Sequence, residues 1–391
     1  MSINWPTTVN ELSFLKDFWQ KKPLLIRNAF TQIPQLISPE ELAGMALETE
    51  VESRIIKSSE RFSDWQLFNG PFDEEDFINL PEAYWTLLVQ DVDKHIPAAR
   101  DLIDQFNFIP RWRIDDLMVS YAADQGSVGP HTDSYDVFLI QLEGKRLWQI
   151  NDEDYSDSDL LPDCDVKVLS NFKKQHEWLL EPGDMLYLPP DVAHWGIAQG
   201  NCLTASVGFL APSATEIFNA WADNILDHLQ DSERYSDPDL QPRSSPAEIT
   251  KSDIRKIDNI LSALLTQNHV STERIFGEMI SQSKTHLEIS TFCEDDIDIE
   301  KHPTQEFSYQ HHPYLRMFYS KTQDNQVLLF ANGETFELDA EEEFARYLCE
   351  NNTIHTEQIN NWIINPKIKK CFHELIRLGC IEILDKPDAD N

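Results

Sequence analysis

The feature that most constrains the fold of this chain is a series of short β-like runs, separated by turn residues, between residues 107 and 210. The runs that fit strands are Ile114–Tyr121, Val137–Leu142, Leu147–Ile150, Met185–Leu188 and Ala205–Leu210. Several short strands at this spacing are typical of antiparallel barrels and sandwiches. We therefore expect this segment to form the β-rich centre of a domain.

Helical patterns flank the β-rich segment. On its N-terminal side an amphipathic helix is predicted over Glu11–Trp19, ended by Pro23 and followed by a short strand at Leu24–Ile26. On its C-terminal side apolar residues recur at three- and four-residue spacing in Glu216–Leu229, Ile254–Leu265 and Thr272–Ser283. With 391 residues, of which 41% are hydrophobic, the chain is long enough for two or three units with cores of their own.

The C-terminal part has a different pattern. An acidic stretch poor in apolar residues, Glu294–Glu306, is typical of a linker. Beyond it, Val327–Phe336 surrounds an Asn-Gly pair and predicts a β-hairpin. The remaining predicted elements are helices at Glu341–Cys349, Thr356–Ile363 and Lys367–Leu378 and a strand at Ile381–Leu384. Small helices bracketed by strands indicate a winged-helix module.

The net charge restricts the possible partners. The chain has 32 Lys and Arg against 68 Asp and Glu, a formal charge of −36. Phosphates would repel such a chain, so we expect no direct binding to nucleic acid. The acidic surface either keeps the protein soluble or attracts a basic partner, and composition alone does not separate these interpretations.

The N-terminal residues, the apolar runs and the cysteines indicate where the protein is located. Met1–Pro6 lacks the basic and apolar regions of a signal peptide, and no apolar run is long enough to span a bilayer. The six cysteines show no C-x-x-C spacing, which favours reduced thiols over a disulfide framework or a zinc finger. We expect a soluble, cytoplasmic protein with no membrane association.

The first motif that carries chemistry is Gly129-Pro130-His131-Thr132-Asp133. In a strand, residues two apart project from the same face, so His131 and Asp133 can approach one ion together. A His-x-acid pair is weak evidence in so acidic a chain, and two others occur, at His286–Glu288 and His355–Glu357. Both of those lie in helical patterns, where residues two apart diverge.

A second motif strengthens the first. Glu181–Pro190 has a Pro-Gly pair that fits a type II turn, then a short apolar strand that a double proline stops. His194 follows at the start of the next predicted strand, which returns it to the barrel mouth where His131 and Asp133 are expected. Two histidines and one carboxylate on one face of an octahedral ion form the facial triad of non-haem Fe(II) oxygenases. The alternative is a surface His131 and a hydrogen-bonded core His194.

A third motif concerns the co-substrate of such an oxygenase. An oxygenase that uses 2-oxoglutarate needs a cation deep in the barrel to pair with the distal carboxylate of this co-substrate. Lys145 and Arg146 both qualify, and strand parity favours Arg146 because it shares a face with Trp148 and Ile150. Ser120, on a neighbouring predicted strand, is placed to donate a second hydrogen bond. A solvated Lys-Arg turn and a serine satisfied within its own sheet are the alternatives.

These motifs together resemble those of the bacterial ribosomal oxygenases, a branch of the JmjC/cupin superfamily. The resemblance extends over most of the chain and rests on Phe18–Pro23, Trp112–Met118, Val128–His131, Tyr135–Phe138, Glu181–Asp184, Ser206–Phe209 and Tyr235–Pro238. Phe18–Pro23 and Tyr135–Phe138 are shared widely among JmjC proteins, while Trp112–Asp116 and Tyr235–Pro238 are more particular to this branch. One departure is Thr132, where relatives have a bulkier apolar residue.

The resemblance implies an α+β fold: a JmjC-type double-stranded β-helix, or cupin barrel, with a helical region and a C-terminal winged-helix module. The domains it implies are a catalytic domain with an N-terminal helical cap (1–211), a helical dimerisation region (212–292), an acidic linker (293–306) and a winged-helix-like domain (307–391). The protein is accordingly expected to form a homodimer. From Pro313 to Asn391 there are 8 Lys and Arg against 14 Asp and Glu, a net −6, which argues against DNA binding by the winged helix.

The resemblance also implies the activity. Bacterial members hydroxylate an arginine of the sixteenth large-subunit ribosomal protein, and eukaryotic relatives hydroxylate histidines of other ribosomal proteins. The chain is thus expected to use Fe(II), 2-oxoglutarate and O₂ to hydroxylate an arginine Cβ in a basic ribosomal protein. The residues that match the family pattern are His131, Asp133 and His194 for iron, Arg146 and Ser120 for 2-oxoglutarate, and Asp116, Tyr135 and Ser206 for the substrate side chain. The alternatives are a ribosomal protein histidine hydroxylase, a JmjC-type demethylase, and a non-catalytic metal-cupin that acts as a binding protein.

Overall fold

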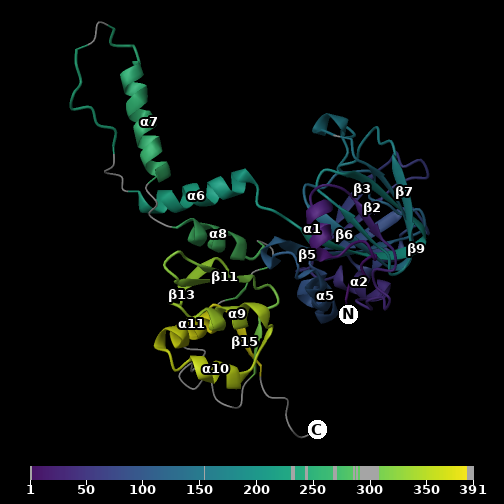
Figure 1. Ribbon diagram of the computed structural model, residues 1–391. Coiled ribbons are helices and arrows are strands. Elements are labelled where there is room, and N and C mark those ends of the chain that lie inside the picture. Colours follow the sequence, from purple (N-terminus) through teal and green to yellow (C-terminus); the bar gives the residue numbers. More distant parts are fainter. Residues whose placement is uncertain are drawn as a thin grey trace. The chain divides into compact units, whose positions relative to one another are not determined.

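The computed structural model describes residues 2–153, 155–229, 234–242, 245–266, 271–284, 287, 289–290 and 308–384 (Figure 1). The chain forms two compact units, Met1–Ala211 and Pro212–Asn391. No helix in the described ranges is long and apolar enough to cross a membrane. The predicted acidic linker at 293–306 lies outside the described residues.

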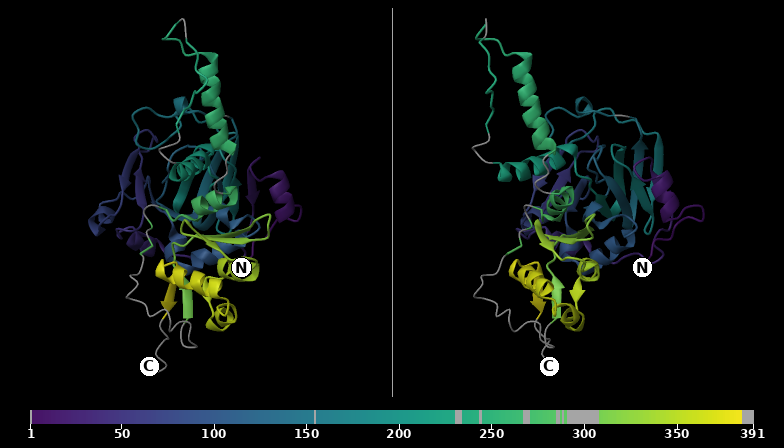
Figure 2. Two further views of the ribbon diagram at one scale, coloured as in Figure 1. Left: turned by 90° about the vertical axis from the view of Figure 1, so that its left-hand side faces the viewer. Right: turned by 60° about the vertical axis from the view of Figure 1, so that its left-hand side comes forward.

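The first unit is built around one antiparallel sheet, and Figure 2 shows its teal strands side by side in both views. In the described residues the strand order is β1 (Leu24–Ile26), β8 (Met185–Leu188), β6 (Asp136–Asn151), β9 (Ala193–Phe209), β5 (Ile114–Ala122), β4 (Trp85–Val89), β2 (Ser53–Lys57) and β3 (Gln66–Asn69), with β7 (His176–Leu180) paired to β6. The helices of this unit are α1 (Glu11–Asp17), α2 (Pro39–Met45), α3 (Glu74–Ile78), α4 (Val92–His95) and α5 (Pro97–Ile103), with 3-10 turns at Asp104–Phe106, Arg111–Arg113 and Asp157–Asp159.

Aromatic side chains form the core on one face of this sheet. Phe14, held on α1 by a capping box between Asn10 and Ser13, is fully buried and packs against Tyr187 at a ring-centroid distance of 4.8 Å. Phe138 of β6 packs against Phe14 as well. Full burial of one such side chain is worth roughly 1.5–3 kcal/mol. The aromatic core therefore fixes β6 and β8 and leaves the opposite face of the sheet for a cavity.

The predicted strands Val137–Leu142 and Leu147–Ile150 are one continuous strand, β6, in the structure. Its pairing with β9 shifts register between Gln141 and Lys145, as at a β-bulge. Gly144 lies there with φ of +63°, and a Cβ on it would come within 2.1 Å of the Asn201 carbonyl oxygen. At the bulge the alternation of side chains between the two faces of the strand shifts by one residue. Val137 therefore faces the cavity before it, and Arg146 faces the cavity after it.

The second unit begins with three helices, α6 (Ala214–His228), α7 (Lys251–Thr266) and α8 (Thr272–Ser281). Its described residues also contain two small sheets, one of β14 (Thr353–Ile354), β10 (Ser308–His311) and β15 (Ile381–Leu384), the other of β11 (Met317–Lys321), β12 (Val327–Ala331) and β13 (Glu334–Glu337). The helices α9 (Glu342–Glu350), α10 (Thr356–Trp362) and α11 (Pro366–Arg377) lie between these strands in the sequence. The predicted Asn-Gly hairpin is present, with Ala331 paired to Glu334.

The cysteines that the structure describes are free thiols: Cys164, Cys202, Cys349, Cys371 and Cys380. Of the two rival His-x-acid pairs, only one residue of the pair at His355 lies on a helix: His355 is the N-cap residue of α10, with extended backbone, and Glu357 lies in the first turn of that helix. His286 and Glu288 of the other pair lie outside the described residues.

Candidate metal centre and active-site cavity

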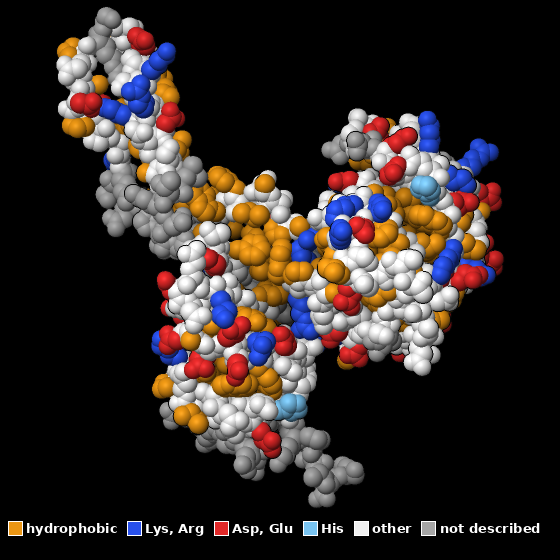
Figure 3. Space-filling model, in the orientation of Figure 1, with side chains coloured by type: hydrophobic (Ala, Val, Ile, Leu, Met, Phe, Trp, Pro, Cys, Tyr) orange, Lys and Arg blue, Asp and Glu red, His pale blue; other side chains and the backbone are white. Residues whose placement is uncertain are grey.

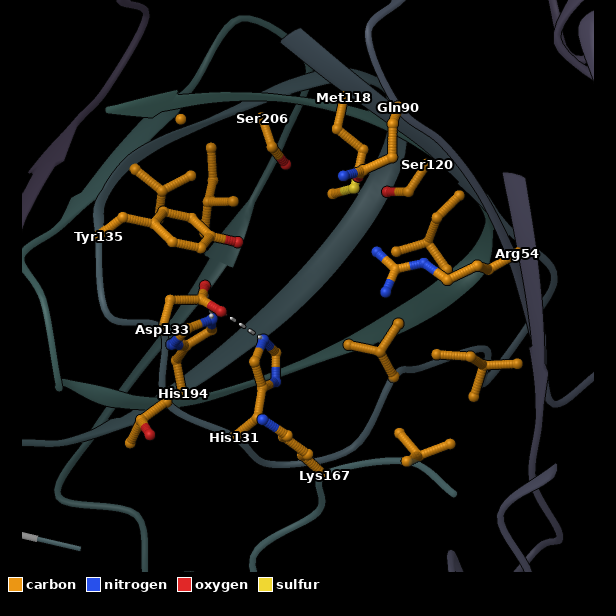
Figure 4. Close-up of a pocket in the computed structure, with 18 of the residues that line it drawn as sticks. Arg54, Gln90, Met118, Ser120, His131, Asp133, Tyr135, Lys167, His194 and Ser206 are labelled. Carbon is orange, nitrogen blue, oxygen red and sulfur yellow. Dashed lines mark ion pairs between the residues drawn. The ribbon is translucent and has the colours of Figure 1, made fainter. Parts of the chain in front are cut away.

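His131, Asp133 and His194 lie together at one end of a cavity in the first unit (Figure 4). One possible ligand atom from each residue lies within 4.8 Å of the others. The Asp133 carboxylate is 3.8 Å from His131 Nε2 and 3.6 Å from His194 Nε2. This is the only such cluster of potential ligands found in the described part of the chain.

The second nitrogen of each imidazole is already engaged. His131 Nδ1 lies 2.9 Å from the Gly129 carbonyl oxygen, and His194 Nδ1 lies 2.9 Å from that of Val192. A carbonyl only accepts, so each Nδ1 carries the proton and each Nε2 presents its lone pair to the cluster. Such contacts orient histidine ligands in metal sites and fix their tautomer.

Backbone pairing brings the two histidines together. His131 N–H donates to the His194 carbonyl over 3.0 Å, and His194 N–H donates to that of His131 over 2.9 Å. The expectation that His131 and Asp133 share one face of a strand was wrong. Only His131 forms a bridge, and Asp133 lies in the following loop before β6 begins. The Asp191 N–H, which donates to the Asp133 carbonyl over 2.7 Å, holds that loop against the start of β9.

Burial keeps His194 neutral. Its side chain is 3% exposed, and burial together with the neighbouring His131 lowers its pKa to about 4. A histidine must be neutral to bind a metal, so this environment suits a ligand near neutral pH. Two imidazole nitrogens and one carboxylate that meet from one side leave further positions of an octahedral ion open. The donor set fits non-haem Fe(II).

The cavity beside this cluster has a volume of about 490 Å³. Arg146 lines it and is 6% exposed, with its Nη1 donating to the Ser120 hydroxyl over 3.2 Å. Its Nε and Nη2 are buried and have no hydrogen-bond partner among the described residues. Lys145 instead points outward and pairs with Glu181 at the surface. The side-chain directions predicted from strand parity are therefore correct, and the cavity contains a buried guanidinium with free donors.

The three residues expected at the substrate side chain also line this cavity. Asp116 and Ser206 are 6% and 7% exposed, and one Asp116 oxygen accepts from the Asp91 N–H over 3.2 Å. The Tyr135 hydroxyl faces the Asp133 carboxylate, and burial first, then the nearby Asp133 and Asp116, raise the pKa of Tyr135. Figure 4 shows Tyr135 and Ser206 around the space next to Asp133. All eight residues singled out in the sequence thus meet at one cavity.

Several lining residues were not anticipated, among them Arg54, Gln90 and Lys167. Arg54 lies on β2 and Gln90 directly follows β4, and the sequence patterns revealed neither strand. Arg54 and Ile56 are two residues apart on β2, so they share a face of the strand. An arginine on a face that otherwise carries apolar residues is the one signal in the sequence that could have indicated its position. Lys167 belongs to a long connection between β6 and β7, and sequence pattern does not place such loops.

Two family models match the chain. The JmjC domain matches residues 101–217, and the ROXA-like winged helix matches residues 263–382. The first match contains all eight of the residues predicted for the site.

Sequence identity to known proteins over most of the chain shows which family it belongs to. The chain is 40% identical to the ribosomal protein uL16 3-hydroxylase of Escherichia coli over 291 residues, 74% of each protein. It belongs to the ribosomal oxygenase family. A probable ribosomal oxygenase of Haemophilus influenzae is 37% identical over 60% of this chain and 56% of that protein.

Solved structures agree with this assignment. The crystal structure of E. coli ycfD superposes with a TM-score of 0.84 at 32% identity, covering 98% of this chain and 100% of that one. Another, described as YcfD in complex with cobalt and 2-oxoglutarate, has a TM-score of 0.80 at 32% identity and covers 97% and 99%. The predicted α+β architecture, a JmjC cupin-type domain followed by a winged helix, is confirmed.

Proposed function

We propose that this protein is an Fe(II)- and 2-oxoglutarate-dependent oxygenase that hydroxylates the Cβ of an arginine in the large-subunit ribosomal protein uL16. The observation that carries the proposal is one cavity with a His-Asp-His cluster and a buried arginine that has two unpaired donors. A dianion that chelates a metal through one end and presents a carboxylate at the other satisfies both features. The relative named as a uL16 3-hydroxylase and the structure with cobalt and 2-oxoglutarate support the same choice.

The charge of the cavity favours a cationic substrate side chain. The charged lining residues, histidines aside, are the cations Arg54, Arg146 and Lys167 and the carboxylates Asp115, Asp116, Asp133 and Asp165. They leave one net negative charge. A divalent metal and the 2-oxoglutarate dianion cancel each other, so that negative charge remains for a substrate cation. An arginine carries its charge at every physiological pH, whereas a histidine is largely neutral, so the cavity favours arginine.

The residues that line the cavity have separate roles in the proposed reaction. His131, Asp133 and His194 would hold Fe(II), and Arg146 and Ser120 would hold the 5-carboxylate of 2-oxoglutarate. Bound together, iron, 2-oxoglutarate and O₂ supply the oxidising power that inserts one oxygen atom into a C–H bond. Asp116 would pair with the substrate guanidinium, and Ser206 and Tyr135 would confine the side chain so that its Cβ faces the metal. The apolar walls, including Leu139 and Val137, exclude water.

The acidic surface fits a ribosomal protein as substrate. A net charge of −36 attracts a strongly basic protein and speeds its encounter with the enzyme. The same charge supports the expectation that neither the enzyme nor its winged-helix module binds nucleic acid directly.

Exposed apolar residues of the helical region support a homodimer. They lie on α6 and α7 and comprise Ile217, Phe218, Leu226, Ile254, Ile257, Ile260 and Leu261. Figure 3 shows hydrophobic side chains gathered over α6. Exposed apolar side chains gathered on a helix in this way mark an interaction surface.

The test of the function is a coupled assay. The purified protein with Fe(II), 2-oxoglutarate and O₂ should form succinate in step with hydroxylation when ribosomal protein uL16 is added, and little without it. A variant of the substrate with the target arginine replaced by lysine serves as the control. Succinate formation that does not depend on added uL16 would contradict uL16 as the substrate. A protein that binds metal but forms no succinate would indicate a non-catalytic binding role.

A further inference from the structure

Arg54 is a cation of the cavity that the proposed mechanism leaves without a partner. It lies on β2, where it pairs with Leu88 of β4, and Leu88 pairs with Ser120 of β5. Residues directly opposite each other in antiparallel strands project to the same face of a sheet. The Arg54 side chain therefore projects from the face of the sheet that lines the cavity, in the same cross-strand row as Ser120.

The guanidinium of Arg54 extends back along this row. Neighbouring strands lie ~4.8 Å apart, so the two-strand offset between Arg54 and Ser120 is roughly 10 Å at the backbone. Figure 4 shows the Arg54 side chain crossing into the cavity with its guanidinium directed toward Ser120, across from Tyr135 and Asp133.

No protein group in the described ranges neutralises Arg54. Its Nε is buried and has no hydrogen-bond partner, and no carboxylate there lies within ion-pair distance. Other arginines of this unit have such partners: Arg113 pairs with Asp136 at 3.1 Å and Arg27 with Asp184. A guanidinium kept partly out of water without a counter-charge costs free energy, which a bound anion offsets.

The identity of that anion follows from the charges around it. The substrate arginine is a cation and is repelled by Arg54, so the anion belongs to the co-substrate. One end of 2-oxoglutarate has to face the metal cluster, and the other carboxylate lies by Ser120, the residue that Arg146 already contacts. A carboxylate has about four lone-pair positions, enough for two guanidinium groups and a hydroxyl.

Building on the proposed function, we propose that Arg54 is a second arginine contact to the 5-carboxylate of 2-oxoglutarate, opposite Arg146. The two arginines form a clamp that prefers a dianionic 2-oxo acid over one lacking the distal carboxylate. Arg54 is thus a specificity-determining residue supplied by the strands outside the core of the barrel.

The test is isothermal titration of the full-length, Co(II)-loaded protein, which binds without turning over. The ligands are 2-oxoglutarate and 2-oxopentanoate, which has a methyl group where 2-oxoglutarate has its 5-carboxylate. Arg54→Gln should weaken 2-oxoglutarate about tenfold, ~1.4 kcal/mol, and leave 2-oxopentanoate unchanged. Arg54→Lys should restore part of the loss, since it retains the charge without the planar fork.

Lys57→Gln is the matched control, because Lys57 lies on the same strand with its Nζ over the Phe68 ring, 4.7 Å from the centroid. It should bind both ligands as the unaltered protein does. Equal 2-oxoglutarate affinity in Arg54→Gln and the unaltered protein would overturn the proposal for Arg54 and leave the proposed function standing. An equal loss for both ligands would also overturn it, since Arg54 would then act away from the 5-carboxylate. An unaltered protein that does not bind 2-oxoglutarate would overturn the function and this assignment together.

Discussion

Replacing Arg146 by glutamine should severely weaken 2-oxoglutarate binding, whereas the same change at Lys145 should have little effect. Arg146 is 6% exposed inside the cavity, with two nitrogens unpaired, while Lys145 is an exposed side chain paired with Glu181. The two residues are adjacent and carry the same charge. The pair of variants therefore separates a buried charge contact from a general loss of positive charge.

The expected magnitude follows from burial. Removing one partner of a buried, hydrogen-bonded charge pair costs roughly 2–5 kcal/mol. At about 1.4 kcal/mol per tenfold, a loss of ~3 kcal/mol raises the Kd of 2-oxoglutarate about a hundredfold. An exposed ion pair such as that of Lys145 contributes roughly 0–1 kcal/mol, so its loss should alter the Kd less than about fivefold.

Thermal unfolding with Mn(II) in place of Fe(II) is a suitable assay. A ligand at 100 times its Kd stabilises a protein by about 2.7 kcal/mol, and one at its Kd by about 0.4 kcal/mol. At a fixed 2-oxoglutarate concentration, the unaltered protein and Lys145→Gln should therefore gain several degrees in Tm and Arg146→Gln almost none. Without ligand, Arg146→Gln should be no less stable than the unaltered protein, because it removes a buried charge with unpaired donors.

The reverse pattern would contradict the assignment of Arg146 to the distal carboxylate. If Lys145→Gln loses the ligand-induced shift and Arg146→Gln keeps it, the register of β6 beyond its bulge is wrong by one residue. If both keep it, the distal carboxylate binds elsewhere.

Three further predictions concern the metal, the substrate and the surface charge. His131→Ala or Asp133→Ala should abolish Co(II) binding and turnover while the circular dichroism spectrum stays unchanged, and full activity in either variant contradicts the ligand set. Asp116→Asn should raise the KM for uL16 at least about tenfold, since a buried charge partner is lost, and leave the Kd of 2-oxoglutarate unaltered; a change in that Kd alone would assign Asp116 to the co-substrate. Between low and moderate salt, kcat/KM for whole uL16 should fall steeply and kcat/KM for a short arginine peptide should fall less, because screening limits the reach of the electric field to about 8 Å at physiological ionic strength. Equal salt dependence for the two substrates would show that the acidic surface does not attract uL16.

The central strands and the site could be predicted because their signals are local. A strand alternates its side chains, a Pro-Gly pair starts a turn, and an Asn-Gly pair forms a hairpin, so β5, β8 and β12–β13 were found from a few neighbouring residues each. The choice of Arg146 over Lys145 needed only the parity of the residues after the bulge.

What could not be predicted depends on contacts distant in sequence. The loop position of Asp133 is set by backbone pairing with the segment around Asp191 and His194, which lies about 60 residues later. The continuity of β6 depends on Gly144 fitting against the Asn201 carbonyl. Arg54 joins the cavity only because β2 and β4 extend the sheet beyond β5, and nothing in the local pattern of β2 indicates which strand it will pair with.

The most direct test of the proposed function is the intact mass of large-subunit ribosomal proteins from cells with and without this gene. We expect uL16 to be about 16 daltons heavier when the gene is present, with fragmentation placing the oxygen on an arginine side chain. A plasmid copy should restore the difference and a His131→Ala copy should not. Identical uL16 masses in the two strains, or a 16-dalton difference on a histidine of another ribosomal protein, would contradict it.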